Sequence, residues 1–216
     1  MKKEEREKLL KQKLIDMSVY EKELYAKGIS TVAGVDEVGR GPLAGPVLAA
    51  CVVLSADWDI PGLDDSKKLS EKKRNEMFQI ISDRALAIGT GMADNNTIDE
   101  INILNATKQA MRQAVAEAEK QLGDAIGHVL VDAVTIEGIG NEQTAIIKGD
   151  AKSISIAAAS IIAKVTRDNM MKEYALEYPY YAFESNKGYG TKAHYQGINE
   201  HGITPIHRKT FLKGIL

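Results

Sequence analysis

Several residue types that characterise secreted, metal-thiolate or membrane proteins are scarce in this chain. Cys51 is the single cysteine among 216 residues, so neither an intrachain disulfide nor a thiolate metal site can form. The charged start, Met1–Lys8, does not have the pattern of a secretory signal. The most apolar run, residues 154–163, ends at Lys164 and is too short to span a bilayer. We therefore expect a cytoplasmic protein with a reduced cysteine and no membrane partner.

The chain also lacks an excess of charge of either sign. Its 28 basic and 30 acidic side chains give a formal net charge of −2, which neither favours nor excludes a polyanionic partner. Hydrophobic residues at 44% and charged residues at 27% are close to the globular average, so the chain is long enough and apolar enough to bury a core. We divide it into a charged helical N-terminal extension, residues 1–30, and a main domain, residues 31–216.

The hydrophobic pattern predicts an α/β protein. Strands alternate with helices after an initial hairpin, which favours a sheet of mixed direction. One helix is expected to start with a capping box at Thr97–Glu100 and to bury Leu104 and Leu122. The expected strands are residues 31–35, 47–54, 87–92, 129–131 and 144–147, and the expected helices are residues 1–28, 71–84, 97–122, 153–178, 191–201 and a short one after Pro205.

The most informative stretch is Ala33–Pro46. Asp36-Glu37 ends a short apolar run, and Gly39-Arg40-Gly41 follows at once. The two glycines have no Cβ atom, so the backbone there can adopt positive φ and come within hydrogen-bonding distance of a ligand. A glycine-rich turn beside acids is often only a tight connection, but this one concentrates acids, glycines, prolines and an arginine. We interpret it as a preformed, anion-tolerant corner at the end of a strand.

Four carboxylates share one feature, because each lies where an apolar strand ends. They are Asp36, Glu37, Asp132 and Asp150. Ligands of open α/β sheets bind beyond the carboxyl ends of the strands, so these four could converge on one crevice. Hard oxygen ligands favour Mg²⁺ or Mn²⁺, and two such ions about 4 Å apart suit in-line phosphoryl transfer. The alternative for each acid alone is a turn residue or a helix cap, and this alternative is strongest for Asp150.

Several blocks in a fixed order resemble the bacterial ribonuclease HII family. The resemblance covers about residues 31 to 210 and begins with the Gly34–Pro46 corner. It continues through Asp64–Leu69, Val131-Asp132, Lys148-Gly149-Asp150, Ala157–Asp168 and Lys187–Thr191. Arg40 and Pro42 favour this family over the sibling ribonuclease HIII, whose pattern lacks the Arg-Gly-Pro turn.

The resemblance implies a ribonuclease H-like fold with a five-stranded mixed sheet flanked by helices and a helical C-terminal segment. It makes Asp36, Glu37, Asp132 and Asp150 the catalytic, metal-binding acids. It assigns Gly39-Arg40-Gly41 and Tyr189 to the 2′-hydroxyl and the sugar of a ribonucleotide. The implied reaction is metal-dependent cleavage on the 5′ side of a ribonucleotide, leaving 3′-hydroxyl and 5′-phosphate ends. The implied substrates are RNA/DNA hybrids and duplex DNA containing ribonucleotides, with roles in ribonucleotide removal and primer removal.

Basic side chains suited to phosphates cluster locally. One cluster spans residues 67–74 and includes Lys67. Lys187, Lys192 and Arg208 belong to a C-terminal tail, which is the better candidate for binding phosphates. We expect a monomer. The competing hypothesis is a hybrid-binding module without catalysis. A dinucleotide-binding domain is disfavoured because the acids precede the glycines and the G-x-G-x-x-G spacing fails.

Overall fold

The computed structural model describes residues 3–214. The long helices and the strands follow one another in the order α1 (Lys3–Met17), α2 (Val19–Ala26), β1 (Val32–Val38), β2 (Val47–Val53), α3 (Glu71–Arg84), β3 (Ala87–Ala93), α4 (Asn95–Leu122), β4 (His128–Asp132), β5 (Gln143–Ile146), α5 (Ile154–Glu177) and α7 (Lys192–His201). The short helical turns are η1 (Gly149–Ala151), η2 (Pro179–Tyr181), α6 (Phe183–Asn186) and η3 (Lys209–Phe211).

The strands form one five-stranded sheet in the order β3-β2-β1-β4-β5. β1 pairs antiparallel with β2, and β2 with β3, whereas β1–β4 and β4–β5 are parallel. The predicted mixed sheet and its opening hairpin are therefore confirmed. β1 is the central strand, and its acidic end lies beside the end of β4 because Val35 is opposite Val131.

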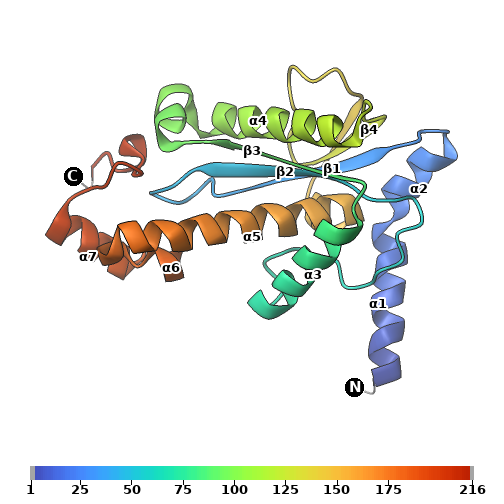
Figure 1. The fold of residues 1–216 in the computed structure, drawn as a ribbon, viewed down its shortest axis with the longest axis horizontal. Helices are drawn as coiled ribbons and strands as arrows, with labels where there is room; N and C mark the ends of the chain where they lie inside the picture. The colour runs from blue at the N-terminus through green and yellow to red at the C-terminus, as the bar shows by residue number, and fades with distance from the viewer. Residues whose placement is uncertain (1–2, 215–216) are drawn as a thin grey trace.

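Helices cover both faces of the sheet. Figure 1 shows α4 on one face, α5 and α3 on the other, and α6 and α7 gathered at the far end of α5. Small residues bring these layers close together. A Cβ atom on Gly34 of β1 would lie 2.0 Å from the carbonyl carbon of Ser155 in α5, and one on Gly89 of β3 would lie 2.0 Å from the Ala114 oxygen in α4. The core thus forms two apolar layers, one on each side of the sheet.

Two helices differ from expectation. The N-terminal segment is a pair of helices that meet at Ser18, and only the part of the expected helix from residue 3 onward lies within the described residues. α4 begins before the expected capping box, because Asp94 is the N-cap and accepts a hydrogen bond from the Thr97 amide at 2.8 Å. Asn102 has a φ of 65° and interrupts this helix, so Leu104 does not share the buried stripe and is 43% exposed.

Candidate active site

The first two acids, Asp36 and Glu37, lie near the C-terminal end of β1, the central strand. β1 stays in register with β2 through Asp36, opposite Ala50, and Glu37, opposite Ala49. Asp36 is 6% exposed, and its Oδ1 accepts a hydrogen bond from the Glu37 amide at 2.7 Å. Side chains of neighbouring strand residues normally point to opposite faces. Both of these nevertheless line one cavity, so Asp36 and Glu37 can serve one site.

The other two acids come from the parallel half of the sheet. Asp132 is the last residue of β4, and Asp150 lies in the turn η1 that follows β5. The Gly149 amide donates a hydrogen bond to Asp132 Oδ1 at 2.6 Å, which joins the two segments. The structure therefore brings all four predicted acids to one edge of the sheet, as expected for ligand sites beyond parallel strand ends.

Burial and the neighbouring carboxylates raise the pKa values of Asp36, Glu37 and Asp150 at this edge. Burial raises the pKa of Asp36 well above its usual value, and the neighbouring Glu37 and Asp132 raise it further. Burial also raises the pKa of Glu37, against the opposing effect of Arg40. For Asp150, burial, Asp65 and Asp132 all raise the pKa. Such shifts follow from crowded, desolvated carboxylates, whose negative charge a divalent cation would neutralise.

The four acidic side chains do not converge on a single position that an ion could occupy. Within residues 3–214, no three Asp, Glu, His or Cys side chains meet tightly enough to hold an ion as they stand. Two of the acids are engaged by main-chain amides, Asp36 by its neighbour and Asp132 by Gly149. The donor set nevertheless fits a hard divalent cation, because it consists of oxygen ligands with excess negative charge.

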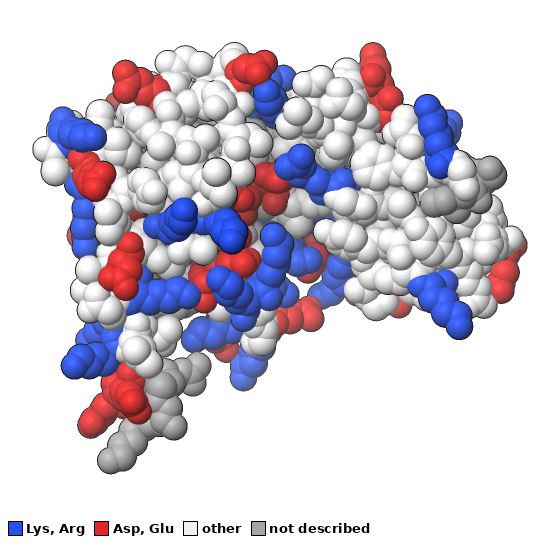
Figure 2. All heavy atoms as spheres, turned by 180° about the vertical axis from the view of Figure 1, so that it is seen from behind, with Lys and Arg blue, Asp and Glu red and all other residues white. Residues whose placement is uncertain are grey.

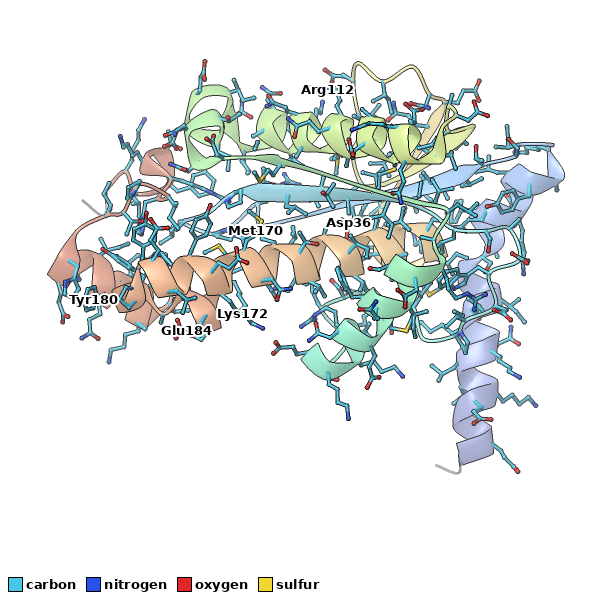
Figure 3. The ribbon with its side chains drawn as sticks, in the orientation of Figure 1. Asp36, Arg112, Met170, Lys172, Tyr180 and Glu184 are labelled. Atoms are coloured by element: carbon cyan, nitrogen blue, oxygen red, sulfur yellow. The ribbon has the colours of Figure 1, made fainter. Side chains whose placement is uncertain are left out.

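A cavity of about 180 Å³ lies beside the acids. Its lining residues are Asp36, Glu37, Val38, Ser66, Lys67, Ser160, Lys164 and Tyr189. Figure 3 places Asp36 between the sheet and α5, the helix that carries Ser160 and Lys164. Burial lowers the pKa of Lys67, but Asp36, Asp65 and Asp150 outweigh it and raise the pKa, so this lysine is a firmly charged neighbour of the acids.

The glycine corner follows directly on Val38, which lines the same cavity. Gly39 has a φ of 89°, the left-handed conformation that favours glycine, whereas Gly41 is absent from the positive-φ residues among those described. Gly41 lies beside Tyr189, since a Cβ atom there would be in ordinary van der Waals contact with Tyr189 Cε1, at 3.4 Å. The side chain of Arg40 is 43% exposed and lies 3.4 Å from Glu37 Oε1.

Tyr189 is 46% exposed and is held by its backbone. Gly188 packs tightly against the corner, because a Cβ atom there would lie 2.4 Å from the Ala44 oxygen. The Leu43 amide also donates to the Gly188 carbonyl at 2.8 Å. The backbone that carries Tyr189 is therefore fixed against the glycine corner, with the ring beside Gly41.

A histidine pair supports the same loop. The Thr204 amide donates to His207 Nδ1 at 2.9 Å, which leaves the proton of His207 on Nε2. That Nε2 lies 3.0 Å from His194 Nε2, so His194 is the acceptor and its Nδ1–H donates to the Tyr189 carbonyl at 3.0 Å. Both rings are thus neutral and buried, and neither is available to contact a phosphate.

Arg208 corrects an expectation. It was predicted to contact substrate, but it is fully buried and its guanidinium donates only to main-chain carbonyls. The acceptors are Gly39 at 2.6 Å, Arg40 at 2.9 Å and Gly45 at 2.8 Å. A guanidinium with five donors in a planar fork suits such a turn. Arg208 therefore holds the glycine corner in shape and does not lie on the surface.

The remaining predicted basic residues lie apart from one another. Lys67 borders the acids, whereas Lys192 is exposed at the start of α7. Lys187 is half-buried, and its Nζ donates to the Glu184 carbonyl. Figure 2 shows basic and acidic side chains interleaved around a hollow on the face opposite Figure 1, with no uniform basic surface.

Two residues near the site were missed from the sequence. Asp65 is close enough to raise the pKa of Asp150, yet only Lys67 of its segment was assigned a role. Arg167 is fully buried and donates to the carbonyls of Pro46 at 2.9 Å and Lys187 at 2.9 Å, which ties the corner to the C-terminal segment. Both residues lie within blocks that carry the resemblance, which was the available signal.

Comparison with known proteins decides the family. The family profile described as Ribonuclease HII matches residues 33–213. The chain is 55% identical to ribonuclease HII of Clostridioides difficile (strain 630) over 205 residues, which are 95% of this chain and 79% of that protein. It is 53% identical to ribonuclease HII of Bacillus subtilis (strain 168), over 98% of this chain and 81% of that protein. The chain belongs to the ribonuclease HII family.

Solved structures agree with the fold of this ribonuclease HII chain. The ribonuclease H2 of Pyrococcus horikoshii OT3 superposes with a TM-score of 0.68 at 28% identity, covering 86% of this chain and 96% of that one. A Bst ribonuclease HIII in complex with Mn²⁺ shares the fold with a TM-score of 0.62 at 18% identity, covering 84% of this chain and 64% of that one. The five-stranded ribonuclease H-like architecture predicted from the sequence is confirmed.

Family membership establishes the general activity. The ribonuclease HII chain is an endoribonuclease of the ribonuclease H class, depends on a divalent metal ion and acts on RNA/DNA hybrids. Among the described helices, none is both long and apolar enough to cross a bilayer.

Proposed function

We propose that this enzyme hydrolyses the phosphodiester bond on the 5′ side of a ribonucleotide, both in RNA/DNA hybrids and at ribonucleotides embedded in duplex DNA. The products are 3′-hydroxyl and 5′-phosphate ends. The proposal rests on one observation above all: the glycine corner and Tyr189 face each other beside the cavity lined by Asp36 and Glu37. A sugar-reading surface thus lies next to the carboxylates.

Asp36, Glu37, Asp132 and Asp150 are the side chains that would hold the metal, and we propose two ions of Mg²⁺ or Mn²⁺. When bound, such ions make water a stronger nucleophile and stabilise the leaving oxygen. The raised pKa values of Asp36, Glu37 and Asp150 support this role, because they come from burial and from neighbouring carboxylates, and a bound cation offsets both effects by stabilising the charged form. The acids then deprotonate and become better ligands.

The protein itself supplies the choice of sugar. A 2′-hydroxyl both donates and accepts a hydrogen bond, and it distinguishes RNA from DNA at one position. The main chain of Gly39-Arg40-Gly41 offers groups for such bonds, and Arg208 keeps them in place through the Gly39 and Arg40 carbonyls. A site that leaves these groups unpaired with a deoxyribose can reject it by ~10⁴. Tyr189 stacks its exposed ring on the neighbouring sugar.

Charged side chains orient the backbone of the duplex. Lys67, beside the acids, is placed to contact the phosphate next to the scissile bond, while Lys187 and Lys192 lie farther along the C-terminal segment. Phosphate contacts of this kind set position and carry no sequence information. We propose that the enzyme acts as a monomer in the cytoplasm, in ribonucleotide and primer removal, because a single chain supplies every group named here.

The decisive experiment uses an end-labelled DNA duplex with one ribonucleotide and an all-DNA control, each in Mg²⁺, Mn²⁺ and chelator. One metal-dependent cut 5′ to the ribonucleotide, with the control intact, is the expected result. Cleavage of long hybrids only would contradict the roles of the glycine corner and Tyr189 while leaving the acids in place. Binding without any cleavage would support the non-catalytic alternative.

A further inference from the structure

The N-terminal helices reach the catalytic edge through a buried carboxyl group. Glu21 of α2 is 2% exposed, although α2 is otherwise a surface helix. Its Oε1 accepts hydrogen bonds from Ser153 Oγ at 2.5 Å and from the Ser155 amide at 3.0 Å. These residues are 132 and 134 positions away in sequence and form the start of α5. A carboxyl group at this place complements the positive end of the helix dipole.

We propose that Glu21 is a positioning residue for the metal-binding acids, which rests on the function proposed above for Asp132 and Asp150. The connection is a chain of hydrogen bonds. Ser153, held by Glu21, donates its amide to the Gly149 carbonyl at 2.9 Å. The amide of Gly149 donates in turn to Asp132 Oδ1 at 2.6 Å. Asp150 is the next residue and lies inside the same turn.

The same contact sets the position of the central strand. Gly34 of β1 abuts Ser155 so closely that a Cβ atom would lie 2.0 Å from the Ser155 carbonyl carbon. Asp36 follows two residues later in β1. Glu21 therefore contacts the start of α5 where α5 packs against β1 and η1. Asp36 lies in β1, Asp150 lies in η1, and Asp132 is bonded to η1 through Gly149.

A second contact of the N-terminal helices reaches the other side of the site. Lys13 of α1 forms an ion pair with Asp64, the neighbour of Asp65 and near neighbour of Lys67. The helices α1 and α2 thus support two segments, the turn that carries Asp150 and the loop that carries Asp64 and Asp65. The described part of the N-terminal extension, residues 3–30, thus supports the catalytic edge.

The burial of Glu21 is costly, which argues against simple docking. Two buried side-chain oxygens among the described residues have no hydrogen-bond partner, and these are Glu21 Oε2 and Ser155 Oγ. An apolar residue would attach α2 to the core without this desolvation cost. Groups that surround a metal site and orient its ligands typically change metal affinity by 10–100-fold when they are removed.

The test measures Mn²⁺ binding by calorimetry on the full chain, with Glu21→Ala compared with the wild type and with Glu23→Gln, an exposed control in the same helix. We expect Glu21→Ala to weaken Mn²⁺ binding about 10-fold. Glu21→Gln keeps one oxygen to accept both bonds and should restore most of the affinity. Wild-type affinity in Glu21→Ala would overturn the proposal, even if the melting temperature fell.

A double-mutant cycle tests the route. If Glu21 acts through Ser153, the double variant Glu21→Ala/Ser153→Ala binds Mn²⁺ no more weakly than the weaker single variant. Additive losses would contradict this route. Should Glu21→Ala not fold, the Ser153→Ala variant alone decides, since unchanged affinity there also overturns the proposal. Absence of cleavage by the wild type would refute the proposed function, whereas the Mn²⁺ comparison tests Glu21 independently.

Discussion

Arg208 donates a hydrogen bond of 2.6 Å to the carbonyl oxygen of Gly39, across 169 positions of sequence. The bond joins the C-terminal segment to the corner that we assign to the ribose. Because Gly39 has a φ of 89° and a Cβ atom there would lie 2.1 Å from Arg167 Nε, this corner is both unusual in conformation and tightly enclosed. The shape of the proposed ribose-binding surface therefore depends on two buried arginine side chains, Arg167 and Arg208, that pack against it.

Arg208→Lys should impair the enzyme although it keeps the positive charge. Lysine cannot reproduce the planar fork that reaches several carbonyls at once. Each lost bond from a charged donor is worth about 1.5–3 kcal/mol, so the melting temperature should fall by several degrees. Cleavage at a single ribonucleotide should fall as well. Differential scanning calorimetry and the cleavage assay measure both, with exposed Lys213→Ala as the control. An unchanged variant would show that the corner keeps its shape without this arginine.

Asp132→Asn should abolish cleavage while largely preserving duplex binding. The carboxyl group is a proposed metal ligand, and its loss should exceed the 10–100-fold effect typical of residues that only orient ligands. Binding is retained because phosphate contacts come from other side chains. Single-turnover cleavage and fluorescence anisotropy give the two quantities. Normal activity of this variant would refute the metal assignment.

Tyr189→Ala should reduce cleavage of one embedded ribonucleotide more than it weakens general duplex binding. Stacking of a base on an aromatic ring contributes about 1–3 kcal/mol, which is an upper bound for a ring that packs against a sugar. Tyr180→Ala is the matched control, because Tyr180 is also exposed but stacks on His201, at the far end of α5 in Figure 3. Equal losses in cleavage and binding for Tyr189→Ala would argue for a general contact with the duplex.

The contribution of His207 to stability should fall as the pH drops from about 6.5 to about 4. Burial lowers the pKa of His207 to about 4, whereas an unfolded histidine has its ordinary pKa of 6.5. Between these values the unfolded chain binds the extra proton, so the free energy of unfolding rises with pH across this window. The protonated ring would also lose the Thr204 amide as a donor to Nδ1.

The pH effect of His207 has to be separated from that of the acids. The raised pKa values of Asp36 and Glu37 change stability in the opposite direction, because the folded state then binds more protons. Urea titrations from pH 4 to pH 7 should therefore show that the wild type gains stability relative to His207→Gln as the pH rises from about 4 to about 6.5. Exposed His201→Gln should follow the wild type. Parallel profiles for all three would exclude His207 as the source.

The order of the elements and the main acids could be predicted from the sequence, because both depend on local pattern. Apolar runs that end at Asp36-Glu37 and Asp132 became the strands β1 and β4, with the acids at one edge of the sheet. The left-handed turn at Gly39 follows from the missing Cβ atom. Errors in the helices also had local causes, such as the Asp94 cap and the irregular backbone at Asn102.

Only the tertiary structure decided which charged residues are buried. In sequence, Arg208 belongs to a basic tail and Glu21 to a charged helix, and nothing local distinguishes them from solvated neighbours. Their roles come from partners more than 130 positions away, at Gly39 and Ser153. The His194–His207 hydrogen bond joins residues only 13 positions apart, but the burial of both rings is likewise a matter of tertiary packing. Local pattern determines where a chain bends and what ends a strand, whereas burial depends on packing between distant segments.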